Sequence, residues 1–175
     1  MVSTAAVVLN EGVHGEQVFE WAADPLPAGP DRAFEIARGI TAELHGFTLA
    51  GYFTYIPYRP NCGMFGSCCG WCGTEGIRNE GTLTVADSTV TGHLFGISSS
   101  AYSYDATLTV RNSTLSGNHV GLWGSGSTLV TNSTMSAVDD SLAIMVYGDV
   151  ALTNTIVDGE CAGPGVITSN GYNIE

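Results

Sequence analysis

The chain has no lysine, and its five arginines stand against 17 acidic residues, giving a formal net charge of −12. A surface of that sign repels phosphate backbones, so nucleic acids and anionic membranes are excluded as favoured partners. Long apolar runs are also missing, and the longest fall well short of a membrane span, so no membrane insertion is expected. Cations, basic proteins and neutral sugars remain compatible with this charge.

No extended helical pattern is present either. Instead, 23 glycines and abundant Ser, Thr and Asn favour tight turns and β-structure. A length of 175 residues with 44% hydrophobic content suits one core, which predicts a single domain over residues 1–175. The first residues lack the basic start and apolar stretch of a secretory signal. We therefore expect a chain that is not exported, or an interior piece of an exported one.

A repeated unit indicates the architecture. Its clearest copies, LTVADSTVTG and LTVRNSTLSG, begin at Leu83 and Leu108, and shorter or diverged copies begin at Leu129, Val150 and Ala42. A second short element precedes each copy, at Gly76-Ile77, Gly96-Ile97, Gly121-Leu122, Ala143-Ile144 and Gly165-Val166. Each repeat therefore contains about three short strands separated by turns.

Apolar and polar residues alternate within these copies, as in a strand with one buried face. Such a unit can bury that face only by stacking on further copies, with neighbouring strands parallel and about 4.8 Å apart. We predict an all-β, right-handed parallel β-helix of about six coils, with Val85, Val110 and Leu152 in one apolar stack. An antiparallel sandwich or barrel is disfavoured, because hairpins do not require the same side chain at the same place in every repeat.

One polar position recurs in every clear copy: Asp87, Asn112, Asn132 and Asn154, at steps of 25, 20 and 22 residues. A row of ligands is one interpretation. Stacked side chains that satisfy backbone groups at a turn are the favoured one.

Residues 76–85 (GIRNEGTLTV), running into residues 87–92 (DSTVTG), resemble the repeat of bacterial surface β-helix proteins. These include the polymorphic outer-membrane protein type and the choice-of-anchor Q group, which share the pectin-lyase-like shape. Residues 154–161 and 169–174 are similar to the segment that closes the helix in the anchor group. The resemblance covers roughly residues 33–175 and is more specific for fold than for activity.

The resemblance implies an extracellular or cell-surface location. It also implies a fragment of a longer chain, because in that family the Gly-Tyr-Asn segment is normally followed by more residues, often including a cysteine. We therefore expect the remainder of its own chain as a partner, and self-association through the unpaired strand edges of an uncapped coil.

Four of the five cysteines crowd into one segment: Cys62, Cys68, Cys69 and Cys72. They interrupt the repeat, since residues 52–75 stand where other repeats have about three residues, which predicts a loop projecting from one coil. Two disulfides would fasten such a loop in an exported protein. A four-thiolate zinc site is disfavoured by the adjacent Cys68 and Cys69, and free thiols remain open. Cys161 is expected at the same turn about four coils away, roughly 20 Å distant, having lost a partner beyond the C-terminus.

Pectate-lyase chemistry would need several carboxylates on calcium beside an arginine or lysine. Asp139 and Asp140 are adjacent and so cannot point out from the same strand face, and no arginine lies in their repeat. Glycosidase chemistry would need facing carboxylates, and no such set shares one position of the repeat. We favour a protein that is not an enzyme and has no cofactor, with Ca²⁺ or Zn²⁺ as the alternatives left open. A polysaccharide lyase or glycoside hydrolase is the alternative.

One turn nevertheless gathers residues suited to a ligand. Successive coils place His93, His119, Asp139, Asp140 and Glu160 there, and the insertion adds Tyr52, Tyr55, Tyr58, Phe65 and Trp71. Aromatic faces beside polar acceptors suit sugar binding, although the same aromatics could simply pack the loop onto the coil. We predict a surface scaffold or adhesion module that contacts carbohydrate or a surface protein.

A third hypothesis comes from the threonine-rich strands. Thr82 and Thr84, then Thr107 and Thr109, bracket inward leucines. Regular ladders of this kind on flat β-helices resemble ice-binding surfaces. The ladder fails at the next coil, which has Thr128-Leu129-Val130 instead.

Overall fold

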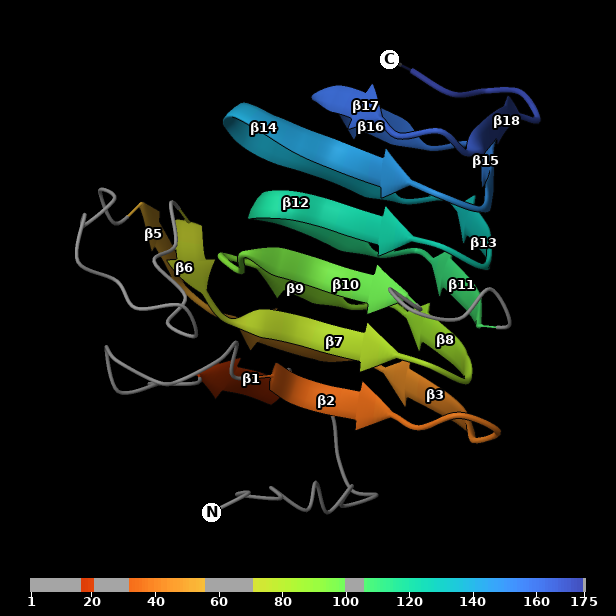
Figure 1. The fold of residues 1–175 in the computed structure, drawn as a ribbon. Helices are drawn as coiled ribbons and strands as arrows, with labels where there is room; N and C mark the ends of the chain where they lie inside the picture. The colour runs from red at the N-terminus through yellow and green to blue at the C-terminus, as the bar shows by residue number, and fades with distance from the viewer. Residues whose placement is uncertain (1–16, 21–31, 56–70, 100–105, 175) are drawn as a thin grey trace, which may run out of the picture.

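The computed structural model describes residues 17–20, 32–55, 71–99 and 106–174. Every regular element in these ranges is a β-strand, and 16 of the strands form two sheets of parallel strands. Figure 1 shows the strands stacked in order along the molecule, from β2 near the N-terminus to β17 near the C-terminus. Among the described residues there is no helix that could span a membrane.

The larger sheet, of ten strands, contains two rows. The outer row, which carries the candidate site, consists of β2 (Arg32–Ile36), β7 (Glu75–Asn79), β10 (Phe95–Ser99), the second halves of β12 (Thr114–Gly124) and β14 (Thr134–Val146), and β17 (Glu160–Ala162). The other row consists of β1 (Gln17–Glu20), β4 (Phe47–Ala50), β9 (Thr89–Thr91), the first halves of β12 and β14, and β16 (Ile156–Asp158). The rows join because β12 and β14 are long enough to belong to both.

The second sheet has six strands, all paired in parallel. They are β3 (Thr41–His45), β8 (Thr82–Ala86), β11 (Thr107–Arg111), β13 (Ser127–Thr131), β15 (Asp149–Thr153) and β18 (Val166–Ser169). Successive strands of one sheet come from successive repeats, and the chain visits the other sheet between them. The protein is therefore a parallel β-solenoid.

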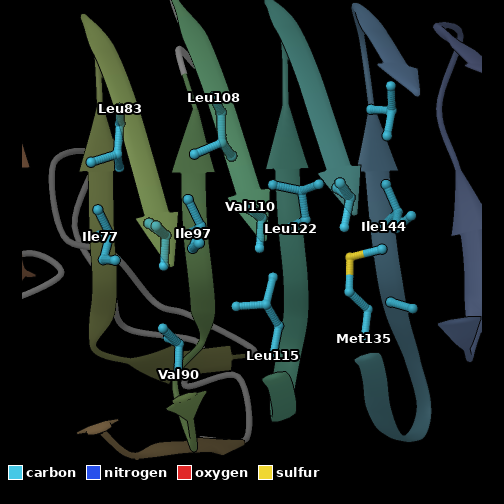
Figure 2. Close-up of a cluster of buried hydrophobic side chains, with 14 of the residues drawn as sticks. Ile77, Leu83, Val90, Ile97, Leu108, Val110, Leu115, Leu122, Met135 and Ile144 are labelled. Atoms are coloured by element: carbon cyan, nitrogen blue, oxygen red, sulfur yellow. The ribbon is translucent and has the colours of Figure 1, made fainter. Parts of the chain in front are cut away.

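The core is built from matching positions of the repeats. Val85, Val110, Val130 and Leu152 lie in register on neighbouring strands and are at most 1% exposed. The apolar stack predicted from the repeat is therefore confirmed. On the outer row Ile77, Ile97, Leu122 and Ile144 form an equivalent stack, as Figure 2 shows.

The recurring polar position forms a ladder of side-chain hydrogen bonds. Asn112 Nδ2 donates to Asp87 Oδ1 at 3.1 Å, Asn132 to Asn112 Oδ1 at 3.2 Å, and Asn154 to Asn132 Oδ1 at 2.8 Å. All four residues have φ between 49° and 51°, a left-handed conformation that Asn and Asp tolerate better than other side chains. The predicted stacking of these side chains at a turn is therefore confirmed, and the hydrogen bonds join the side chains to one another.

The alignment of the third copy is confirmed, since Thr128 pairs with Leu108 and is buried, while Leu129 pairs with Thr109 and is 42% exposed. One detail of the repeat alignment is wrong. Gly165-Val166 does not continue the outer row, because Val166 pairs with Asp149 in the six-stranded sheet. The coil there is shorter than the others, so Cys161 takes the place beside Ile144.

The position predicted for Cys161 is also wrong. Cys161 lies within β17 rather than at the turn that carries the insertion.

The insertion starts as a hairpin. β5 (Phe53–Tyr55) and β6 (Trp71–Gly73) pair antiparallel, and the Thr74 amide donates to the Tyr52 carbonyl at 2.9 Å to close its base. In Figure 1 this hairpin stands off the side of the stack. Glu75 already belongs to β7, since it pairs with Arg32 and Phe95, so the insertion ends slightly earlier than predicted.

Candidate functional site

Three aromatic rings line up across the outer row. Phe95 on β10 meets Trp123 on β12 edge-on, with ring centroids 5.0 Å apart and planes at 63°. Trp123 in turn stacks on Tyr147, which directly follows β14, with centroids 6.0 Å apart and planes at 19°. The neighbours Leu122 and Val146 point into the core and are almost fully buried. Because side chains alternate along a strand, Trp123 and Tyr147 point outward, and Phe95 lies on the same surface because its ring contacts Trp123.

Apolar side chains extend this surface. Leu142 pairs with Val120, and Met145 pairs with Trp123, so both lie beside the rings and are partly buried. Tyr147 remains 43% exposed. We call the set Phe95, Val120, Trp123, Leu142, Met145 and Tyr147 the aromatic face.

Charged residues occupy the adjacent strands β2 and β7. Arg32 contacts Glu35 at 3.0 Å and Glu75 at 3.4 Å, and Arg78 contacts Glu80 at 3.0 Å. Glu75 is 5% exposed, and burial raises the pKa of its carboxyl group, while a hydrogen bond with Ser98 and the two arginines act in the opposite direction. The outer row is thus divided into a charged half and an aromatic half that meet where Glu75 pairs with Phe95.

The root of the inserted hairpin is a second polar cluster. Thr74 Oγ1 lies 2.8 Å from His93 Nδ1, accepts from the Tyr52 amide at 3.1 Å and donates to the Tyr52 carbonyl at 3.2 Å. The His93 amide donates to Asn118 Oδ1 at 2.9 Å. His93 is 0% exposed, and burial lowers the pKa of its ring from 6.5 to about 4. Its ring is therefore shielded from an external ligand in this arrangement, and the predicted ligand contact of His93 stays a prediction.

His119 lies one coil further along. Its amide donates to the His93 carbonyl at 2.9 Å, and its Nδ1 lies 2.8 Å from Ser141 Oγ. The Phe53 ring of the hairpin packs on the imidazole, with centroids 5.8 Å apart. Burial lowers the pKa of His119 as well.

The structure brings together Tyr52, His93 and His119 of the predicted site. Tyr55 and Trp71 face each other in the hairpin ladder, and Asp139 and Asp140 lie within β14, but their side chains are outside the described part of the chain. Tyr58, Phe65, Cys62, Cys68 and Cys69 lie outside the described residues, as does the side chain of Cys72. The disulfide and zinc interpretations therefore stay predictions. Elsewhere in the described ranges, no three His, Cys, Asp or Glu side chains converge as a metal site would require.

No protein-family model matches the chain, and no curated protein or solved structure is significantly similar to it. The resemblance to surface β-helix proteins therefore rests on the residues of the repeat alone.

Sequence reasoning missed the aromatic face. Phe95 stands at the start of its strand, Trp123 near the end of its own, and Tyr147 just beyond β14. These are three different positions of the repeat, so superposing the repeats does not align them. The one available signal is local: Trp123 follows the inward Leu122 and must point outward.

Proposed function

We propose that this protein is a non-catalytic binding scaffold of the cell surface or extracellular space, and that its aromatic face contacts neutral carbohydrate. The observation that carries the proposal is the row of rings formed by Phe95, Trp123 and Tyr147 on the outside of a rigid parallel sheet. A monomeric surface seldom exposes grouped aromatics without a binding role.

Sugar rings suit such a row. Their C–H faces pack on aromatic rings, and their hydroxyl groups need polar partners at the border. The Tyr147 hydroxyl and the charged half of the outer row supply polar partners beside the rings. Strands about 4.8 Å apart place rings on neighbouring coils within reach of one short chain of sugars running along the solenoid.

Charge favours a neutral ligand. The chain carries a net charge of −12, and the exposed Glu35 lies on the charged half of the outer row. An acidic polysaccharide would be repelled there, whereas a neutral one would not.

Binding is also favoured over hydrolysis or elimination. Glu75, beside Phe95, is paired with Arg32, and Glu160, beside Leu142, lies four strands further along, roughly 19 Å away at about 4.8 Å per strand. A glycosidase needs two carboxylates facing each other across the scissile bond, one of them kept protonated. Right-handed winding, about six coils and a pectin-lyase-like shape are part of the same proposal, as is a contribution from the inserted hairpin and its predicted aromatic residues.

The test is a screen of the purified chain against neutral and acidic polysaccharides, with and without calcium. Both retention of the protein and release of unsaturated or reducing sugar ends are measured. We expect retention by one or more neutral polysaccharides and no product. Calcium-dependent product formation would replace the proposal with a lyase, and the absence of retention by any polysaccharide would contradict it.

Ice binding is a second candidate because of a threonine array on the other row. Thr48, Thr89, Thr114 and Thr134 lie in register on β4, β9, β12 and β14, and Thr91, Ser116 and Ser136 form a parallel row beside them. These hydroxyl groups repeat about every 4.8 Å across the strands and about 7 Å along them. The array is longer than that of Thr84 and Thr109, which ends at Leu129. Thermal hysteresis measured on the same sample decides this candidate.

A further inference from the structure

The inserted hairpin is attached to the solenoid through His93. Thr74 at its root bonds to both Tyr52 and the His93 ring. Gly51 lies directly against the same ring, and a Cβ atom there would overlap it. The segments on either side of the hairpin therefore cover the imidazole, and moving them apart is the change that would expose it to water.

His119 forms a second attachment. The Phe53 side chain of β5 packs on its ring, and the two histidines are joined by the bond between the His119 amide and the His93 carbonyl. Both attachments thus depend on imidazole rings, that of His93 fully buried and that of His119 partly buried in the closed arrangement.

The surroundings of His93 disfavour a charged ring. Burial lowers its pKa more than a hydrogen bond with the Leu49 backbone raises it. Thr74, Gly51 and Gly76 lie against the ring and are uncharged. Glu75 adjoins Gly76, but its carboxylate is engaged by Arg32 and Ser98 on the outer row.

We propose that His93 and His119 form an acid-sensitive latch that holds the inserted hairpin against the solenoid at neutral pH and releases it on acidification. Protonation places a charge on His93 within a buried, uncharged site. Opening the root of the hairpin lets water hydrate the charged ring. The parallel coils remain folded, because their stacked apolar core does not include these rings.

The direction follows from linkage. The closed His93 ring binds its proton at a pKa of about 4, whereas an exposed ring does so near 6.5. Acid therefore favours the open form between these values. The opening constant should rise roughly 30-fold between pH 7.5 and pH 5 from His93 alone. His119 acts in the same direction, and Glu75, whose carboxyl pKa is raised, acts in the opposite direction.

The test is hydrogen exchange of backbone amides at pH 7.5 and pH 5.0, corrected for the intrinsic exchange rate at each pH. We expect amides of Phe53–Tyr55 and Trp71–Gly73 to lose protection by about the predicted factor, while those of Thr107–Arg111 do not change. Unchanged protection of the hairpin at pH 5.0 would overturn the proposal. An equal loss of protection in the amides of Thr107–Arg111 would also overturn the proposal, since the whole molecule would then be opening.

Variants isolate the histidines. The double substitution His93→Asn with His119→Gln should remove the pH dependence of hairpin exchange, whereas His45→Gln, at an exposed histidine bonded to Asp87, should preserve it. If the pH dependence of hairpin exchange persisted in the double variant, the latch would be contradicted. Thr74→Val keeps both rings and should raise hairpin exchange already at pH 7.5; no effect there would show that the bond between Thr74 and His93 does not hold the hairpin.

Discussion

The indole ring of Trp123 and the phenol ring of Tyr147 lie nearly parallel, 19° apart in plane and 6.0 Å apart between centroids. Trp123 belongs to β12, and Tyr147 follows β14, the strand paired with it. The stack therefore fixes both rings on neighbouring coils before any ligand arrives. Because the two rings are already ordered, binding of a sugar would incur a smaller loss of side-chain entropy.

We expect Tyr147→Ala to weaken binding of a neutral polysaccharide about tenfold, because the substitution removes one ring and frees Trp123 to rotate. Tyr147→Phe keeps the ring and should retain most of the affinity. Both variants should unfold near the wild-type temperature, since the side chain is 43% exposed. Equal affinity of Tyr147→Ala and wild type would remove this residue from the site.

Val110→Asp should cost several kcal/mol of unfolding free energy. Val110 is 0% exposed between Val85 and Val130, so the carboxylate would be buried without a partner. Thr107→Asp on the same strand is the matched control, because Thr107 is exposed. Urea unfolding measures both, and similar stability of the two variants would refute the register.

Thr128→Val should stabilise the fold by about 1 kcal/mol. The Thr128 hydroxyl is buried without a hydrogen-bond partner, and the residue lies between Leu108 and Val150 in an otherwise apolar position. Thr155→Val is the matched control with the opposite sign, since that buried hydroxyl donates to the Thr153 carbonyl at 2.9 Å. Loss of stability in Thr128→Val would mean that its hydroxyl has a partner.

Asn132→Ala should destabilise the protein more than Asn132→Gly does. Both lose the hydrogen bonds to Asn112 and from Asn154, but only alanine also incurs the cost of a left-handed backbone at φ 50°. The expected difference is about 1 kcal/mol in unfolding free energy. Equal effects would show that backbone conformation contributes little to the ladder.

The repeat could be predicted because its signals are local and recur. Val110 and Asn112 occupy the same positions as Val85 and Asp87, and stacking in register is the only arrangement that buries one set and bonds the other. The alignment of the repeats fails where a coil differs in length from its neighbours. After Ile144 the chain shortens its coil, so Cys161 rather than Val166 becomes its neighbour, and nothing local to either residue indicates this.

The candidate site was harder to predict for a related reason. Phe95, Trp123 and Tyr147 meet only because three coils are stacked, and each ring comes from a different position of its repeat. For His93, conversely, the sequence indicates a surface residue in a turn. Its burial depends on Gly51 and Thr74, which close over the ring from either side of a long insertion.

The last coil should promote self-association. Val166 and Ile174 are 57% and 63% exposed there, and within the described residues β17 and β18 have no paired strand on their outer side. We expect light scattering to detect oligomers that grow with concentration, and Val166→Lys to reduce them. A monomer at all concentrations would contradict this expectation.

Calorimetric titration of wild type and Trp123→Ala with a neutral polysaccharide retained in the screen tests the central claim most directly. Trp123 lies in the middle of the aromatic face, and its loss should weaken binding at least about tenfold without changing the cooperativity of unfolding. Leu129→Ala, at an exposed apolar side chain on the six-stranded sheet, is the matched control and should bind like wild type. Undiminished affinity of a folded Trp123→Ala variant would show that carbohydrate is bound elsewhere and would contradict the account.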